Sequence, residues 1–364
     1  MKYIITSESV SAGHPDKLCD QISDAILDAY LAQDPLARVA CECLVTTNHL
    51  IIAGEITSTA RVDHESIARK TITDIGYNRP DMYFDGNTCQ ITDLTHTQSP
   101  DIAMGVDTGG AGDQGIMYGY ASDETSELMP APITYAHRLA QWLYNLRINK
   151  IINYLRPDAK TQVSVEYDNG KVIRIDTIVV STQHDEHISQ DQIYTDIKTH
   201  LIQPLLGDLI DDQTILHINP TGQFIIGGPH GDTGLTGRKI IIDTYGWVGR
   251  HGGGAFSGKD PTKVDRSAAY MARYLAKYCV AKWRCKQCEV QLWYAIGVVQ
   301  PVSIYINCFS TETRNIEDII KDLKQFDCSP NGIINFFDLR RPIYQQTAAY
   351  GHFWRQEFPR EHIK

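Results

Sequence analysis

The sequence predicts an α+β protein built from three related domains. One order of elements, a helix followed by two strands and a second helix, occurs three times along the 364 residues. Apolar residues recur at helical spacing in some segments and alternate in others, which distinguishes the helices from the strands. The boundaries between the copies fall in glycine-rich segments, so we expect domains at 1–105, 106–229 and 230–364.

The first copy begins after Pro15, a residue well suited to the first turn of a helix. Leu18, Ile22 and Ile26 then recur at helical spacing. A second helix is predicted to start at Asp63 and to be closed by Gly76. The segments predicted for this copy are a helix at 17–33, strands at 38–46 and 50–59, and a helix at 63–76.

The second and third copies repeat this order. In the second, Asp168-Asn169-Gly170 is typical of a tight turn between two strands. Its predicted segments are a helix at 133–149, strands at 161–167 and 172–181, and a helix at 189–202. Those of the third copy are a helix at 265–282, strands at 289–296 and 303–309, and a helix at 316–326.

Length, composition and charge indicate a globular protein that acts on small molecules. A chain of 364 residues that is 42% hydrophobic can bury two or three domain-sized cores. The net charge of −10 argues against nucleic acid as a partner. No segment is apolar enough for a membrane span, and the apolar run at 1–5 is too short for a signal peptide, so we expect a cytoplasmic protein.

The nine cysteines lie scattered through apolar segments and do not indicate a disulfide framework. Cys285 and Cys288 have the spacing of a metal knuckle, but no second pair completes a tetrahedral site. We interpret the cysteines as reduced core residues.

Residues 250–267 combine glycines, basic side chains and two aspartates immediately before a predicted helix. Glycines let backbone N–H groups approach phosphate, lysines neutralise it, and aspartates bind hard cations through oxygen. Gly253, Gly258 and Lys259 match the spacing of a Walker A loop, but Asp260 replaces the hydroxyl residue which that motif needs for its metal. The segment therefore predicts a polyphosphate site with magnesium, and not a Walker site.

Two shorter segments have related features. His14, Asp16 and Lys17 fall at the positive end of a predicted helix dipole, which favours an anion, although an ordinary helix cap with solvated charges explains the same residues. Residues 110–115 are too rich in glycine for the interior of a helix or strand, which predicts a tight turn or a close approach to a ligand.

Together these segments resemble the S-adenosylmethionine synthetases, also called methionine adenosyltransferases. The resemblance runs in order along nearly the whole chain. The similar segments are 13–17, 110–115, 130–137, 237–239, 252–265 and 347–353. It implies three α/β domains with pseudo-threefold symmetry, each a sheet with helices on one face. It also implies synthesis of S-adenosylmethionine: methionine sulfur attacks C5′ of ATP, and the expelled triphosphate is cleaved to pyrophosphate and phosphate.

The resemblance assigns roles to individual residues of this chain. The implied catalytic residues are His14, Lys160, Arg238, Lys259 and Lys263. The implied ATP-binding residues are His14, Asp158, Lys160, Gln223, Phe224, Asp232, Arg238, Lys239, Ala255 and Lys259. The implied methionine-binding residues are Glu55, Gln98, Asp113, Asp232 and Lys263.

The resemblance also implies ions and a protein partner. Asp16 and Asp265 would bind two magnesium ions per site, and Glu42 would bind potassium. The chain would form a homodimer or a dimer of dimers, with active sites at the subunit interface where Glu55 and Gln98 meet Lys259 of a neighbouring chain.

Two of these residues allow another interpretation from pattern alone, and a third departs from the family that the chain resembles. Glu42 lies on the face of its strand opposite Cys41 and Cys43, as a solvated sheet position would. Phe224, which would pack on adenine, also fits a core aromatic. Gln223 replaces the basic residue that most bacterial relatives carry, so one phosphate or ribose contact is in question.

The segment 99–109 is shorter than the loop that usually gates the site in this family, which predicts a less complete lid. Two other functions stay open at this point: a non-catalytic regulatory homologue, and a kinase-like phosphotransferase that uses the glycine-lysine segment. The full set of histidine, aspartates and lysines argues against the first of these.

Overall fold

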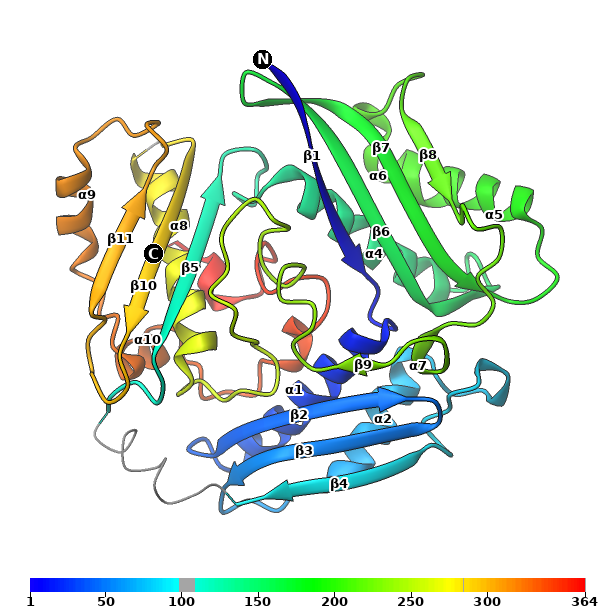
Figure 1. The fold of residues 1–364 in the computed structure, drawn as a ribbon, viewed down its shortest axis with the longest axis horizontal. Helices are drawn as coiled ribbons and strands as arrows, with labels where there is room; N and C mark the ends of the chain where they lie inside the picture. The colour runs from blue at the N-terminus through cyan, green and yellow to red at the C-terminus, as the bar shows by residue number, and fades with distance from the viewer. Residues whose placement is uncertain (98–108, 284, 364) are drawn as a thin grey trace.

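The described residues, 1–97, 109–283 and 285–363 of a computed structural model, form three β-sheets with helices packed behind them. The sheets stand around a common centre and turn their open faces to one side of the molecule (Figure 1). The predicted α+β class is therefore confirmed, and each sheet has its main helices on one face (Figure 1).

The first sheet has the strand order β4-β3-β2-β9. Helix α1 contacts β2 and α2, and its apolar residues are buried in the main core together with Val39 and Cys41 of β2. The predicted helix ends are confirmed: Asp63 Oδ1 accepts a hydrogen bond from Ser66 N, and Gly76 ends α2 with a φ of 118°. The elements are α1 (Pro15–Gln33), β2 (Arg38–Thr46), β3 (His49–Thr57), α2 (His64–Ile75), η1 (Pro80–Met82), β4 (Gln90–His96) and β9 (Gly234–Leu235).

The second sheet has the order β1-β6-β7-β8 and packs against α4. Its two long strands are joined by the predicted turn, where Asn169 and Gly170 have φ values of 50° and 77°. The elements are β1 (Lys2–Val10), α4 (Ala131–Ile148), β6 (Leu155–Asp168), β7 (Lys171–His184), α5 (Gln190–Asp196), the π-helical η2 (Ile197–Ile202), α6 (Gln203–Leu206), η3 (Gly207–Leu209), β8 (Ile215–Ile218) and α7 (Gly228–Gly231).

The third sheet has the order β11-β10-β5 and packs against α8. Buried ion pairs join α8 to the C-terminal segment, since Arg273 and Lys277 both bond to Glu361. The elements are β5 (Gly115–Ser122), α8 (Val264–Trp283), β10 (Gln287–Tyr294), β11 (Ser303–Asn307), α9 (Ile316–Leu323), α10 (Pro330–Phe337), η4 (Gln345–Thr347) and η5 (Pro359–Glu361).

Each sheet takes one strand from a distant part of the chain. Strand β1 pairs with β6, β5 pairs with β10, and β9 pairs with β2. Each of these strands precedes the long helix of another sheet, so α1, α4 and α8 all begin close to a point where the chain crosses between sheets. The candidate phosphate-binding residues lie at these crossings.

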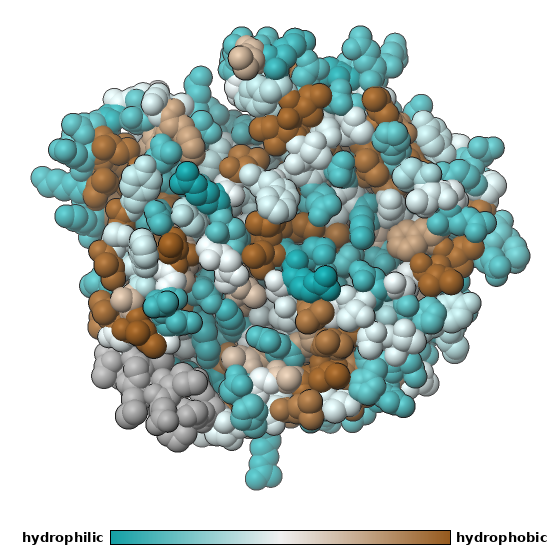
Figure 2. Space-filling view, in the orientation of Figure 1, coloured by the Kyte–Doolittle hydropathy of each residue, from teal (hydrophilic) through white to brown (hydrophobic). Residues whose placement is uncertain are grey.

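The open faces of the sheets carry apolar and polar residues side by side (Figure 2). Leu94 on β4, Trp293 on β10 and Tyr305 on β11 are each about half exposed. Among the described helices, none has the length and apolar character that a membrane span requires.

Candidate active site

Helix α1 begins at a histidine whose tautomer is fixed by the backbone of the helix. His14 is the N-cap, Pro15 occupies the first turn, and His14 Nδ1 accepts a hydrogen bond from Asp16 N at 3.1 Å. Because Nδ1 is an acceptor, the proton of the neutral ring sits on Nε2. Burial, followed by the positive charge of Lys239, lowers the pKa of His14 to about 3. His14 is therefore a neutral side chain with one N–H group to donate.

Asp16 is held by cations and by the backbone of β9. Its carboxylate bonds to Lys239 Nζ at 2.5 Å and to Leu235 N at 2.9 Å, and Arg238 lies 3.8 Å away. Burial alone would raise the pKa of Asp16, but the bonds from Lys239 and Leu235 hold it below its usual value. We call His14, Asp16, Arg238 and Lys239 the Asp16 cluster.

Strand β6 adds two residues of the 158–160 segment to this cluster. Lys160 is exposed, pairs in register with Val10 at the end of β1, and contributes to the low pKa of His14. Asp158 is buried, and its Oδ2 accepts a hydrogen bond from Gly228 N at 2.9 Å. Its Oδ1 has no partner among the described residues, and burial raises the pKa of the carboxyl to about 6.

A second group of charges lies at the start of α8. Lys259 Nζ bonds to Asp265 at 2.5 Å. Gly254 has no room for a side chain, because a Cβ atom there would lie 2.4 Å from Asp265 Cγ. A Cβ at Gly115, the first residue of β5, would lie 3.7 Å from Asp265 Oδ1. We call Lys259 and Asp265, with the Gly254 backbone against them, the Asp265 cluster.

Asp260 proves to be a structural residue. It is fully buried, accepts hydrogen bonds from Val39 N and from Thr262, and forms an ion pair with Lys263. The loop therefore uses Asp260 to fix its own backbone on β2, at the position where a Walker loop would present a metal-binding hydroxyl.

A row of aspartates on α1 positions both clusters. Asp16, Asp20 and Asp24 are spaced by four residues, and their carboxylates accept from the backbone N–H groups of residues 235, 237 and 258 respectively. The rise of an α-helix puts Asp16 and Asp24 about 12 Å apart along the axis. The row therefore attaches the two clusters at separate points of α1.

Comparison with known proteins shows the same organisation along the chain. Three family models match: the N-terminal domain of S-adenosylmethionine synthetase over residues 2–100, its central domain over 108–224 and its C-terminal domain over 226–362. The S-adenosylmethionine synthase of Sorangium cellulosum (strain So ce56) is 55% identical, with an alignment that covers 98% of this chain and 87% of the relative.

The chain belongs to the S-adenosylmethionine synthetase family. It is a methionine adenosyltransferase, which makes S-adenosylmethionine from ATP and methionine, and the family uses a divalent metal ion and a monovalent cation.

The methionine candidates of this synthetase that the structure describes lie on different elements of the fold. Glu55 on β3 pairs in register with Ala40, and Ala40 forms a bridge with Lys259 on its other side. Glu55 and Lys259 thus flank one strand, about 10 Å apart by the spacing of neighbouring strands. Asp113 is exposed beside β5, Asp232 is exposed after α7, and Lys263 is paired with Asp260.

Gln98 and most of the 99–109 segment lie outside the described residues. The prediction of a less complete lid therefore concerns a part of the chain that the structure does not describe.

The adenine candidates lie on the segment that leads to α7. Phe224 is half-buried, whereas Gln223 is exposed. Ala255 lies against Gly237, where a Cβ would come within 2.4 Å of the Ala255 side chain. The Phe224 ring is therefore not a core aromatic, and its accessible part is free to contact a ligand.

The metal candidates fit ions that arrive with the substrate. Across the described residues, no group of three or more His, Cys, Asp or Glu side chains is arranged to hold a metal ion. Asp16 and Asp265 each offer one carboxylate at the start of a helix, which suits Mg²⁺ because this ion keeps waters and completes its shell with phosphate oxygens. Glu42 is exposed on the open face of β2, so a potassium ion there would need further oxygen ligands from elsewhere.

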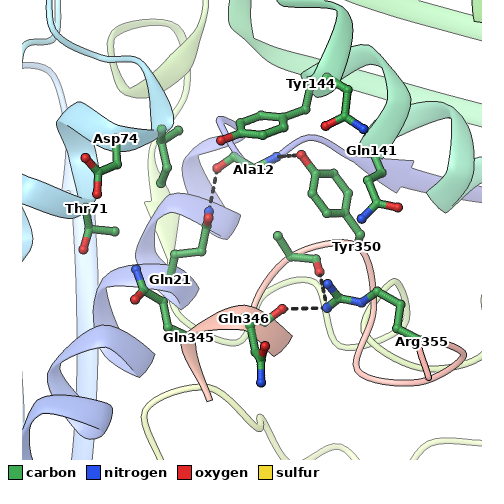
Figure 3. A pocket seen from close by; sticks show the side chains of 13 residues that line it. Ala12, Gln21, Thr71, Asp74, Gln141, Tyr144, Gln345, Gln346, Tyr350 and Arg355 are labelled. Atoms are coloured by element: carbon green, nitrogen blue, oxygen red, sulfur yellow. Dashed lines mark hydrogen bonds between the residues drawn. The ribbon is translucent and has the colours of Figure 1, made fainter. Parts of the chain in front are cut away.

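One cavity among the described residues lies away from these site residues, and a second one that reaches Asp265 is small. A cavity of about 320 Å³ lies among α1, α2, α4 and the C-terminal segment, where Gln21, Tyr144 and Arg355 line it (Figure 3). None of the predicted site residues lines this cavity. The cavity lined by Asp265 and Gly254 is only about 10 Å³, whereas ligand pockets commonly measure 300–1,000 Å³.

All nine cysteines are buried, and none of them forms a disulfide bond. Sequence reasoning missed Asp20 and Asp24 as residues that position the site. Their signal was present, since acidic residues at 16, 20, 24 and 28 recur every four positions along one helix.

Proposed function

We propose that this synthetase joins its substrates in one displacement, in which a lone pair of methionine sulfur forms the S–C5′ bond while the C5′–O bond of ATP breaks. The bonding electrons leave with the triphosphate, which is then cleaved to pyrophosphate and phosphate. No covalent bond to the enzyme is needed. The protein must align sulfur, carbon and leaving oxygen and stabilise the negative charge that develops on the triphosphate.

His14 is the group best suited to the leaving oxygen. Its Nε2–H is the donor, because Nδ1 is engaged by Asp16 N at 3.1 Å. The fixed neutral tautomer is the single observation that carries the proposal, since a donor oriented before the reaction stabilises developing charge without reorganisation.

The basic residues would bind the triphosphate. Lys160, Arg238 and Lys239 lie around His14 and Asp16, and Lys259 lies beside Asp265. The lysines neutralise the aspartates in the structure, so a phosphate chain would replace each aspartate as the partner of its lysine. Magnesium held by Asp16 and Asp265 would neutralise further charge on the phosphates.

We further propose that each active site combines the Asp16 cluster of one subunit with the Asp265 cluster of another, in a homodimer or a dimer of dimers. The two clusters attach to α1 about 12 Å apart, and the small cavity beside Asp265 does not enclose a substrate. The open sheet faces, with Leu94, Trp293 and Tyr305 half exposed, offer apolar area for a second copy.

The other candidate residues would complete the substrate contacts. Phe224 would pack on adenine, with Asp158, Gln223 and Ala255 nearby in the nucleotide site. Glu55, Gln98, Asp113, Asp232 and Lys263 would bind methionine, and Glu42 would bind potassium.

Product analysis tests the proposed chemistry. With ATP and methionine, the enzyme should release a sulfonium product together with pyrophosphate and phosphate in equal amounts, measured by chromatography and ³¹P NMR. ADP as the phosphorus product would instead indicate a phosphotransferase, and the lack of any product would indicate a regulatory homologue. A covalent adenosyl-enzyme trapped by rapid quenching would contradict a single displacement.

Asp16→Asn and Asp265→Asn should each raise the Mg²⁺ concentration needed for half-maximal activity at saturating ATP. An amide keeps the size of the carboxylate but removes the charge that attracts the ion, and a lost charge-assisted contact of about 1.5–3 kcal/mol corresponds to a shift of roughly tenfold or more. Asp28→Asn, a change of the same type in the same helix, is the control, because Asp28 accepts hydrogen bonds from Tyr344 N and Gln345 N and belongs to neither cluster. Equal Mg²⁺ titrations for both site variants and wild type would contradict the metal role.

A further inference from the structure

Two neighbouring side chains at the end of β7 hold the segment that carries Phe224. His184 N donates to Phe224 O at 3.0 Å, and Phe224 N donates to His184 Nε2 at 3.1 Å. Gln183 Nε2 donates to Ile225 O at 2.9 Å. Both side chains are fully buried, whereas Phe224 and Ile225 are partly exposed. We call Gln183 and His184 the Phe224 clamp.

The histidine of the clamp works in one tautomer only. His184 Nδ1 lies 2.8 Å from Asp185 O, and a carbonyl oxygen accepts, so Nδ1 carries the proton. Nε2 is then the acceptor that Phe224 N requires. Replacement by a side chain of the same shape without an acceptor would leave the Phe224 N–H without its partner.

Asp185, the residue that follows the clamp in the chain, forms ion pairs with arginines from two different parts of the fold. Asp185 bonds to Arg156 of β6 at 2.8 Å and to Arg79, next to η1, at 3.0 Å. Burial would raise the pKa of Asp185, but these two arginines hold it below its usual value. The clamp therefore rests on a carboxylate that stays ionised and anchored.

The clamp also determines where the Phe224 ring lies. A Cβ atom on Gly227 would come within 2.7 Å of Phe224 Cε2 and 3.0 Å of Gln183 Cδ. The ring thus packs against the Gly227 backbone beside the Gln183 amide, and the residue as a whole is partly exposed. Backbone and ring are held together, so the clamp limits the orientations that the ring can adopt.

We propose that His184 and Gln183 are positioning residues for the nucleobase of ATP, acting through Phe224. The proposal rests on the proposed contact of Phe224 with adenine and adds the residues that orient it. It assigns the clamp to the base alone, because its side-chain bonds go to residues 185, 224 and 225 and, among the described residues, none goes to the Asp16 cluster.

Equilibrium binding of two ligands, in Mg²⁺ and without methionine, separates the base from the phosphates. Adenylyl imidodiphosphate carries both, whereas tripolyphosphate carries only the phosphates. His184→Phe keeps a ring but removes the acceptor. It should raise the dissociation constant of adenylyl imidodiphosphate about 5- to 10-fold, the equivalent of one lost hydrogen bond. Tripolyphosphate should bind as to wild type. Gln183→Leu should have the same selective effect.

Three further variants make the test decisive. His184→Gln can accept from Phe224 N through its side-chain oxygen and should recover most of the affinity. Val180→Ala, a cavity in the core side of the same strand, should lower the melting temperature without changing the ratio of the two affinities. Phe224→Ala should lower the affinity for adenylyl imidodiphosphate at least as much as His184→Phe does.

If His184→Phe weakened the binding of both ligands equally, or of neither, the proposed role of the clamp would be wrong. If Phe224→Ala left adenylyl imidodiphosphate unaffected, the adenine contact itself would be wrong, whatever the clamp variants did. Neither result bears on product formation, which the product analysis tests separately.

Discussion

His14→Ala should lose roughly a hundredfold or more in turnover while ATP still binds. Loss of one preorganised donor to a developing oxyanion typically costs about 3 kcal/mol in the transition state. The donor is Nε2–H, since Asp16 N occupies Nδ1. The measurements are kcat from the pyrophosphate formed and the affinity for adenylyl imidodiphosphate. Turnover close to that of wild type would reject the role.

His14→Asn is the matched control for the structural part of the histidine. An asparagine at the N-cap can accept from Asp16 N, so it keeps the cap, whose loss in His14→Ala costs about 1 kcal/mol of stability. Its amide does not reach the position of Nε2. Both variants should therefore lose turnover, and only His14→Ala should lose stability. A His14→Asn enzyme with normal turnover would mean that the cap, and not the donor, is what matters.

The pH dependence of turnover gives a second check. Because burial lowers the pKa of His14 to about 3, the ring is neutral throughout the range from pH 5 to 8. Turnover should show no inflection from this residue in that range, and the ratio of wild-type to His14→Asn turnover should be constant. A ratio that falls as pH drops below 6.5 would mean that the ring becomes protonated, so that its pKa is not lowered.

Local signals were enough to predict most helices and central strands. Asp63 and Gly76 end α2 because a short polar side chain accepts from the first turn and a glycine adopts positive φ, and both effects act within a few residues. The strands that were not predicted are β1, β4, β5, β8 and β9. Of these, β1, β5 and β9 each pair with a strand far along the chain, so no pattern within a short window indicates the sheet to which they belong.

The sequence was enough to predict the types of residue in the candidate site, but not how those residues are arranged in space. Glycine, lysine and aspartate in one segment indicate phosphate and metal chemistry, and the structure confirms that Lys259 contacts Asp265. The use of α1 as the common support depends on contacts such as Asp24 with Arg266, which are 242 residues apart. Such a pairing is decided by the three-dimensional packing of α1 and α8.

The separation of the clusters also changes which variants can complement each other. The sequence suggested that Gln98 and Glu55 meet Lys259 only across an interface. In the structure, however, Glu55 and Lys259 of one chain flank Ala40. The pairs that can distinguish a shared site from a site within one chain are therefore one residue from the Asp16 cluster and one from the Asp265 cluster.

Lys239→Ala and Lys259→Ala, each inactive alone, should regain about a quarter of wild-type activity after their subunits are exchanged. If each site takes one cluster from each subunit, a mixed dimer has one site with both lesions and one with neither. Random re-pairing makes half of the dimers mixed, so about one site in four is intact. Exchange is verified by mass spectrometry of differently tagged chains, and activity is measured from pyrophosphate release.

A pair within one cluster is the control. Lys259 and Asp265 are joined by an ion pair of 2.5 Å, so they must serve the same site. Lys259→Ala mixed with Asp265→Asn would then leave one lesion in every site of a mixed dimer, and activity should stay at the level of the separate variants. Regained activity for the first pair alone supports a site shared between subunits. If neither pair regains activity after verified exchange, both clusters serve a site within one chain, and the proposal that two subunits share each site is wrong.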